Sequence, residues 1–281
     1  TIYEPGSVFK VFSMASLLQL GAVTTEDRFT CNGYYEDIVN NIRIKCLGNH
    51  GSVTIQNILQ FSCNAGAAYA SKMADNKSFY NMLRLFGFGA TTGIRLAGET
   101  PGILHVPSGW SARTKPTIVF GQEISVSAMQ IVAAATAFCN KGIMLKPHLV
   151  QKVVSPYGKT VKEYTREPVN RVMSADVARN MLDMMASATA RLARIPGINI
   201  SAKTGTAEVP DSETGTYSED KFVASILGIL PTEDPRLIIY VVINYPKGNI
   251  YGSRIAAPVF REVAERLIPI VDMDHTAIDT I

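Results

Sequence analysis

The stretch YEPGSVFKVFSMASLLQLG, from Tyr3 to Gly21, carries a Pro-Gly turn followed by apolar residues at helical spacing. This spacing predicts a helix over Val8 to Leu20, and Gly21 suits its C-terminal cap. Ser7 and Lys10 stand three residues apart at the helix start, which places both side chains on one face. The pair is either an ordinary helix start with a solvated lysine or a serine nucleophile beside its own base.

Two further motifs favour the second interpretation. An S-x-x-K pair alone is weak evidence, because about one copy is expected by chance in a chain of this size; Ser218 and Lys221 form another. However, S-x-N occurs at Ser62 to Asn64, where two predicted helices meet, and K-T-G occurs at Lys203 to Gly205 on a predicted strand. The three motifs, in this order, are the set used by penicillin-recognising serine acyltransferases.

Longer blocks extend this similarity over nearly the whole chain. They are YEPGSVFK, HGSVTIQNILQFSCN, LRLFGFGATTGIRLAGETPGIL, FGQEISVSAMQ, SAKTGTAE and YGSRIAAPVFREVAERL. With these blocks the chain resembles the transpeptidase domain of a class B (monofunctional) penicillin-binding protein. The GFGATTGI and AAPVF segments favour the septal, cell-division type. One departure is Glu123, where the family usually has glycine near the rim of the cleft.

The expected fold is α/β, an antiparallel β-sheet flanked by helices with an inserted helical subdomain, as in penicillin-binding proteins and serine β-lactamases. Three strands near the end, Asn199 to Ala207, Phe222 to Leu230 and Leu237 to Tyr245, predict a meander faced by the first and last helices. The polar stretch from Glu208 to Lys221 is expected to interrupt it. Residues 1–281 form one transpeptidase domain, with its α/β part at about 1–21 and 195–281 and a mostly helical subdomain at about 22–194.

Within that subdomain, residues 22–50 are turn-rich, and apolar spacing predicts helices over Val53 to Phe61 and Ala65 to Met73. The segment from Met144 to Tyr164 predicts two strands around a Pro-Tyr-Gly turn. The resemblance also implies an upstream segment that supplies sheet strands and a membrane anchor. We therefore expect the chain to be a piece of a longer protein.

The chemistry of acyl transfer gives roles to the motif residues. Ser7 is a poor nucleophile unless a base takes its proton, and Lys10 is such a base only when it is neutral. Burial and a neighbouring cation, Lys203, both lower a lysine pKa. Ser62 is placed to relay a proton to the leaving amine, and Asn64 to bind the substrate amide.

Further roles follow from the resemblance alone. It implies that the backbone N–H groups of Ser7 and Thr206 form the oxyanion hole. It also implies that the strand Lys203-Thr204-Gly205-Thr206 lines the substrate, with Lys203 and both threonine hydroxyls holding its terminal carboxylate. The structural alternatives are a helix-capping Ser62 and a plain edge strand at Lys203 to Gly205.

The predicted function is cross-linking of peptidoglycan by a serine-type D-Ala-D-Ala transpeptidase that β-lactams acylate. Its partners would be the D-Ala-D-Ala donor and amine acceptor stem peptides, a glycan polymerase and divisome proteins, at the periplasmic face of the inner membrane. One alternative is a serine β-lactamase or D,D-carboxypeptidase, although no E-x-x-L-N element of class A β-lactamases occurs. Another is a non-catalytic β-lactam sensor or scaffold domain.

Composition excludes several other classes. The net charge is +3 with dispersed basic residues, so no nucleic-acid partner is expected. The chain has no C-x-x-C pair, and neither a metal nor a cofactor is expected. Cys31 and Cys46 flank one loop-like segment and are either a disulfide or free thiols, whereas Cys63 and Cys139 are interpreted as packing residues. No catalytic role is expected for the histidines or for Trp110; the histidines are His50, His105, His148 and His275.

Overall fold

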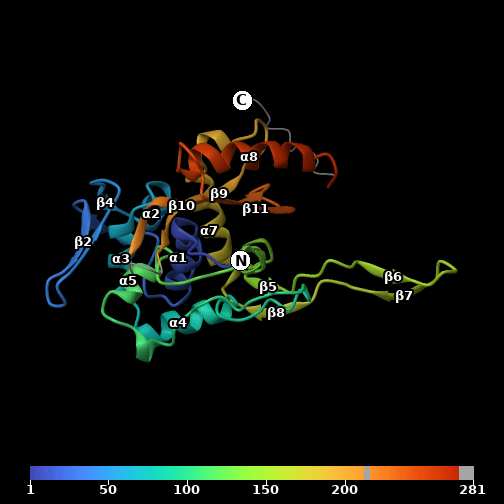
Figure 1. Ribbon diagram of the computed structural model, residues 1–281, viewed down its shortest axis with the longest axis horizontal. Coiled ribbons are helices and arrows are strands. Elements are labelled where there is room, and N and C mark those ends of the chain that lie inside the picture. Colours follow the sequence, from blue (N-terminus) through green and yellow to red (C-terminus); the bar gives the residue numbers. More distant parts are fainter. Residues whose placement is uncertain (212–215, 272–281) are drawn as a thin grey trace.

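Three antiparallel strands form the central sheet, β9 (Ser201–Pro210), β10 (Tyr217–Leu230) and β11 (Leu237–Asn244). They lie in the order β11-β10-β9, so each strand neighbours the next along the chain. The computed structural model describes residues 1–211 and 216–271, and the sheet lies between the C-terminal helix and most of the other helices (Figure 1). The expected meander and the α/β fold class are confirmed.

One face of the sheet is covered by α8 (Gly252–Leu267). The small buried side chains of this helix, such as Ala256 and Ala257, allow close packing, and Phe260 fills the space over Gly228 of β10. A Cβ atom at Gly228 would lie only 2.2 Å from the Phe260 ring. The glycine is therefore needed for the helix to sit at this distance from the sheet.

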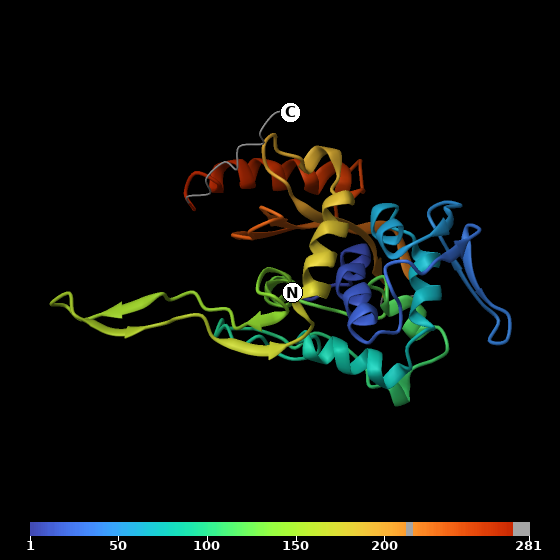
Figure 2. The ribbon, with the colours of Figure 1, turned by 180° about the vertical axis from the view of Figure 1, so that it is seen from behind.

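The other face is covered mainly by α6 (Ala128–Cys139) against β11 and α7 (Ala175–Ser187) against β9. The first helix contacts the sheet mainly through its opening 3₁₀ turn, η1 (Gly6–Phe9), which lies along β9. Its α-helical part, α1 (Lys10–Gln19), runs through the helical layer and is buried over most of its length (Figures 1 and 2). The first helix therefore faces the sheet through η1, as expected, while α6 and α7 cover most of the rest of that face.

An aromatic cluster holds α1 in the helical layer. Phe9 and Phe12 pack against Phe86, Phe88 and Phe138, with neighbouring ring centroids 4.8–6.0 Å apart. All five side chains are buried. Tilted and edge-on pairs of this kind add to the stability that burial provides. The residues just after Ser7 are thus fixed within the core.

Between α1 and β9 the chain forms further helices and eight short strands. The helices are α2 (Ile55–Gln60), α3 (Asn64–Ser71), α4 (Asn76–Leu85), η2 (Pro107–Gly109), α5 (Thr114–Ile118), α6, α7 and η3 (Arg191–Ala193). The strands are β1 (Phe29–Cys31), β2 (Tyr34–Asp37), β3 (Ile42–Lys45), β4 (Gly51–Val53), β5 (Ile143–Leu145), β6 (Lys152–Val154), β7 (Thr160–Glu163) and β8 (Pro168–Arg171). They pair in twos, as β1-β4, β2-β3, β5-β8 and β6-β7. The sequence did not predict the first four, which are only three or four residues long.

The β6-β7 hairpin projects away from the body of the protein (Figures 1 and 2). All of its strand residues are exposed, and its turn lies at Ser155 to Gly158, as the Pro-Tyr-Gly sequence predicts. We call the segment from Lys152 to Glu163 the arm. It contributes nothing to the buried core of the described residues.

The polar stretch after the K-T-G strand is more regular than expected. β9 continues to Pro210 and β10 begins at Tyr217, so both strands extend into the segment that was interpreted as an interruption. Polar strands form here because this end of the hairpin is largely solvated and needs no apolar face. Residues 212–215 of that stretch and His275 lie outside the described residues.

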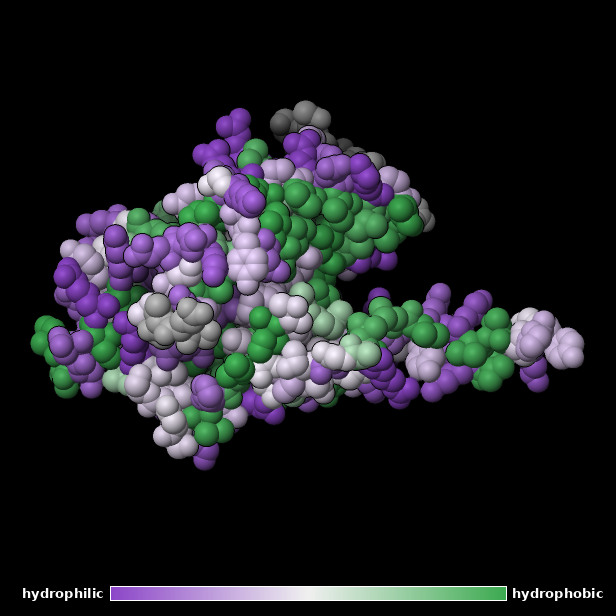
Figure 3. Space-filling view, in the orientation of Figure 1, coloured by the Kyte–Doolittle hydropathy of each residue, from purple (hydrophilic) through white to green (hydrophobic). Residues whose placement is uncertain are grey.

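Strand β11 forms one edge of the described sheet and pairs only with β10 there. Apolar side chains gather over β11 and α8, where Val259 and Val263 are partly exposed (Figure 3). Among the described residues, no helix combines the length and apolar character needed to cross a membrane.

Candidate active site

Ser7 lies in the tight turn that leads into α1. Gly6 has a φ of 56°, a conformation that favours glycine, and a Cβ atom there would lie 3.0 Å from Ala207 on β9. This turn therefore brings Ser7 beside the K-T-G strand. Lys10 begins α1 three residues later, and its Nζ lies 2.7 Å from Ser7 Oγ. The predicted pairing of serine and lysine on one helix face is confirmed.

The S-x-N motif occupies the sharp turn between α2 and α3. Ser62 has a φ of 54°, which is uncommon for a residue with a side chain and is typical of strained functional positions. The turn directs both motif side chains at Lys10. Lys10 Nζ donates to Asn64 Oδ1 at 2.6 Å and to the Ser62 carbonyl oxygen at 3.2 Å, and Ser62 Oγ lies 3.4 Å away.

Lys203 approaches the same serine from the sheet. Its Nζ donates to Ser62 Oγ at 3.1 Å and to the Thr204 carbonyl oxygen at 2.9 Å. Ser62 Oγ thus lies between the two lysine nitrogens. The three motifs, far apart in the sequence, form one connected network from Ser7 through Lys10 and Ser62 to Lys203.

Burial favours the neutral form of Lys10. The side chain is fully buried, and no ion pair within residues 1–211 and 216–271 includes it. Burial and the nearby Lys203 ammonium hold the pKa of Lys10 well below its usual value. Burial lowers the pKa of Lys203 to about 8. Near neutral pH this pair therefore supplies one basic amine beside Ser7 and one cation on the sheet.

The strand after Lys203 is shaped for close approach. A Cβ atom at Gly205 would lie 2.7 Å from Ser225 Oγ and 3.0 Å from the Pro5 carbonyl oxygen, so only glycine fits between η1 and the sheet. Thr204 and Thr206 alternate with it and are partly exposed. The Gly252 N–H donates to Thr206 Oγ1 at 3.1 Å, which leaves the hydroxyl hydrogen of Thr206 able to donate to a ligand.

A group that the motifs do not include borders the site. Glu4 is buried, and its Oε1 accepts a hydrogen bond from the Glu123 backbone N–H at 2.9 Å. Glu123 has a φ of 57°, which explains why a glycine is favourable at this position in the family, and its carboxylate accepts from the Thr117 hydroxyl at 2.6 Å. Burial raises the pKa of Glu4 to about 7. These residues border a cavity of about 340 Å³ with Tyr217.

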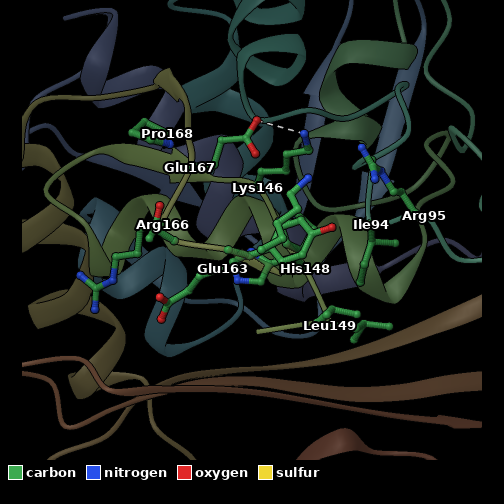
Figure 4. A pocket seen from close by; sticks show the side chains of 15 residues that line it. Ile94, Arg95, Lys146, His148, Leu149, Glu163, Arg166, Glu167 and Pro168 are labelled. Carbon is green, nitrogen blue, oxygen red and sulfur yellow. Dashed lines mark hydrogen bonds and ion pairs between the residues drawn. The ribbon is translucent and has the colours of Figure 1, made fainter. Parts of the chain in front are cut away.

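A second cavity, of about 510 Å³, lies elsewhere, at the base of the arm (Figure 4). It is lined by charged and polar side chains including Lys146 and Glu167, which form an ion pair at 3.0 Å. The ion pair is largely solvated, and the lining contains no serine or cysteine nucleophile. We assign the chemistry to the Ser7 network instead.

The remaining predicted residues have structural places. Trp110 donates its indole N–H to the His105 carbonyl oxygen and packs edge-on against Tyr80, in keeping with a packing role. All four cysteines are free thiols. Cys63 is fully buried in the core, in keeping with a packing role, and its Sγ also accepts a hydrogen bond from the Gly66 N–H at the start of α3 and lies beside Cys46.

Comparison with known proteins decides the family. The model of the penicillin binding protein transpeptidase domain matches residues 1–265. The chain belongs to this family. The transpeptidase domain is 33% identical to stage V sporulation protein D of Bacillus subtilis over 95% of this chain and 42% of that relative. It is 27% identical to the peptidoglycan D,D-transpeptidase FtsI of Escherichia coli over 99% of this chain and 46% of that relative.

Solved structures agree with the fold. A peptidoglycan synthetase from Bifidobacterium adolescentis gives a TM-score of 0.89 at 30% identity, over all of this chain and 51% of that one. Penicillin-binding protein 3 of Mycobacterium tuberculosis, complexed with aztreonam, gives 0.87 at 27% identity, over 96% of this chain and 63% of that one. The family and fold expected from the motif blocks are confirmed. The transpeptidase domain spans less than half the length of stage V sporulation protein D.

Proposed function

We propose that this transpeptidase domain cross-links peptidoglycan through an acyl-serine intermediate. The observation that supports this most directly is the 2.7 Å contact between Ser7 Oγ and the buried amine of Lys10, whose pKa is well below its usual value. Neutral Lys10 takes the hydroxyl proton while Ser7 Oγ attacks the carbonyl carbon of the penultimate D-Ala. The negative charge that develops on the carbonyl oxygen is stabilised by the backbone N–H groups of Ser7 and Thr206.

Collapse of this intermediate breaks the peptide bond. Ser62, which lies between Lys10 and Lys203, passes a proton to the leaving nitrogen, so D-Ala departs as a neutral amine and Ser7 carries an ester. The amine of a second stem peptide then attacks the ester carbonyl, gives up a proton, and Ser7 Oγ regains one. Cross-linking therefore consumes one peptide bond and forms one, and needs no oxidant or external energy source.

Substrate capture is proposed for the K-T-G strand. Charged Lys203 and the hydroxyls of Thr204 and Thr206 would hold the terminal carboxylate of the donor, and Asn64 its amide. The same contacts suit a penicillin, which carries a carboxylate beside its reactive amide. A relative in complex with ampicillin, penicillin-binding protein 3 of Mycobacterium tuberculosis, supports this extension.

The wider setting is also part of the proposal. Peptidoglycan lies outside the cytoplasmic membrane, so the active site would work on that side, held there by an anchor in the longer protein. A septal role with a glycan polymerase and other division proteins is supported by the similarity to FtsI. Co-purification of the full-length protein with such a polymerase tests the partnership.

The fate of the acyl-enzyme separates the proposal from a β-lactamase. Among the described residues, the side chains bonded to Ser7, Lys10 and Ser62 are lysines, serines and an asparagine, with no carboxylate to activate water. Purified protein would be acylated with benzylpenicillin, freed of drug and followed by intact mass. We expect a single adduct on Ser7 that persists for hours and is absent in Ser7→Ala. Release within seconds would indicate a β-lactamase, and labelling of Ser62 or Ser218 would refute the nucleophile.

Turnover separates an enzyme from a sensor or scaffold domain. A synthetic donor ending in D-Ala-D-Ala is incubated with an acceptor amine, and released D-Ala is measured. The transpeptidase releases D-Ala in many cycles and incorporates the amine. A domain that acylates once, or not at all, shows no release beyond one equivalent.

A further inference from the structure

Three cysteines and a histidine lie close together where β1 ends and β4 begins. Cys31 ends β1, Cys46 follows β3, His50 precedes β4, and Cys63 precedes α3. Each residue therefore comes from a different segment. Their sulfur atoms and one histidine nitrogen all lie within 4.8 Å of one another.

The spacing of these four atoms matches a single tetrahedral ion. Zinc binds cysteine sulfur at about 2.3 Å and histidine nitrogen at about 2.0–2.1 Å, so ligand atoms around it lie about 3.8 Å apart for two sulfurs and about 3.6 Å apart for sulfur and nitrogen. Cys46 Sγ and Cys63 Sγ are 3.7 Å apart. His50 Nδ1 is 3.5 Å from Cys31 Sγ and 3.6 Å from Cys46 Sγ. An iron–sulfur cluster would need its ligands spread more widely.

The surroundings orient the ligands toward one point. All three cysteines are buried, and His50 directs Nδ1 inward while its ring stacks on Phe61 with centroids 5.5 Å apart. Stacking fixes the plane of the imidazole, which is a role that outer neighbours play in built metal sites. The Gly66 N–H donates to Cys63 Sγ at 3.2 Å, a contact that favours a thiolate.

We propose that Cys31, Cys46, His50 and Cys63 bind one Zn²⁺ as a structural Cys₃His site. Three soft thiolates and an imidazole form the ligand set that selects zinc over magnesium or calcium, and four protein ligands leave no open position for catalysis. The ion supplies contacts that a segment of strands only three or four residues long cannot supply by apolar burial. It ties the β1-β4 and β2-β3 pairs to the start of α3.

The site also fixes the active-site turn. Cys63 is the middle residue of the S-x-N motif, between Ser62 and Asn64, and both of these residues contact Lys10. A metal bond to Cys63 therefore restrains the turn that directs the motif at Lys10. This second consequence rests on the proposed function: loss of the ion is expected to slow acylation of Ser7 by at least tenfold, whereas metal binding itself is independent of catalysis.

Few features of the sequence indicate this cluster. Zinc ligands are ordinarily recognised from pairs two to four residues apart, and only Cys46 and His50 are so close. Cys31 and His50 are 19 residues apart, and Cys46 and Cys63 are 17 apart. Pairing of β1 with β4, which places Cys31 opposite Gly51, brings the ligands together.

The test is metal uptake by the reduced, untagged protein. Metal is removed from the protein with a chelator under reducing conditions, and the protein is titrated with Zn²⁺ or Co²⁺. Bound metal is measured by inductively coupled plasma mass spectrometry. We expect one equivalent of zinc, a higher Tm with zinc, and a sulfur-to-cobalt charge-transfer band of the intensity given by three thiolates. Uptake below about 0.2 equivalents, or a cobalt spectrum without thiolate bands, would overturn the site.

Variants assign the ligands. Cys31→Ser and His50→Ala are expected to lower zinc affinity at least tenfold, whereas Cys139→Ser and His148→Ala, which lie outside the cluster, should keep one tight equivalent. Unchanged affinity in Cys31→Ser or His50→Ala would also overturn the proposal. If a variant fails to fold, the cobalt spectrum of the unmodified protein remains decisive. Protein isolated without reductant provides a further outcome. A disulfide between Cys46 and Cys63 in that protein, together with failure of the reduced protein to bind zinc, would identify a redox pair instead.

Discussion

Burial, together with the nearby Lys203 ammonium, favours loss of a proton from the Lys10 amine and lowers its pKa. Acylation should therefore accelerate as pH rises through the lowered pKa of Lys10, since only the neutral amine accepts the Ser7 proton. It should slow again near pH 8, as Lys203 loses the charge that holds the carboxylate. Stopped-flow acylation with a fluorescent penicillin checks this bell-shaped profile. A Lys203→Arg variant, whose charge does not titrate, should lose the alkaline fall; an identical profile in that variant contradicts the assignment.

Removal of the base itself has a larger effect. Lys10→Ala should reduce the acylation rate by about 10²–10⁴-fold while the protein stays folded, because a general base contributes that much to the reaction. Lys115→Ala is the matched control, a partly buried lysine that donates to the Ala74 carbonyl oxygen away from Ser7. Circular dichroism and penicillin labelling follow both variants. Equal labelling rates in Lys10→Ala and the wild type would refute the role of Lys10.

Glu4 makes stability depend on pH. Its pKa of about 7 in the folded protein exceeds its value of 4.5 in the unfolded chain, so the folded state holds a proton that the unfolded state has lost between these values. Protonated Glu4 makes its full contribution to the free energy of unfolding below about pH 4.5. This contribution, about 3 kcal/mol, is lost as the pH rises through about 7. The free energy of unfolding, measured with urea between pH 5 and 8, should depend less on pH in Glu4→Gln than in the wild type. An unchanged slope would show that Glu4 is charged in the folded protein.

At the scale of elements, two glycines of the sheet allow close packing against different elements, Gly205 against η1 and Gly228 against α8. Gly205→Ala pushes a methyl group toward Pro5 and Ser225 beside Ser7, whereas Gly228→Ala pushes one into the Phe260 ring of α8. Both changes should lower stability by about 1–3 kcal/mol. Only Gly205→Ala should also slow penicillin acylation of the folded fraction, measured by titrating active sites. Normal acylation in Gly205→Ala would mean that η1 does not need this close approach.

The elements that could be predicted are those with a strong local signal. Apolar periodicity indicated α1, α8 and the strands β9 to β11, and the Pro-Tyr-Gly turn indicated the arm. The strands β1 to β4 could not be predicted, because three or four residues carry too short an alternation. The active-site motifs were found because their spacing is local. Glu4 was missed because its burial is set by contacts with the chain near Glu123, more than a hundred residues away.

At the scale of the molecule, we expect the edge strand β11 to favour self-association of this 281-residue chain. Its outer backbone groups pair with nothing in the described part of the chain, and apolar side chains lie beside them. Such an edge favours pairing with another copy. Val242→Lys, on β11, should therefore lower the tendency of the 281-residue chain to aggregate, measured by light scattering. Val153→Lys on the arm is the control, and an equal effect there would contradict a role for the edge.

The arm also offers a way to divide the chain without dismantling the fold. Lys152, Lys159, Lys162 and Arg166 are exposed on it or beside it, and the core lies elsewhere. A brief digestion with trypsin should nick the backbone here first. Denaturing gels would then separate a penicillin-labelled fragment carrying Ser7 from a second carrying Lys203, although gel filtration would still show one particle. A nicked protein that keeps its rate of acylation would contain a nucleophile and a carboxylate-binding lysine on two separate polypeptides, joined only by packing.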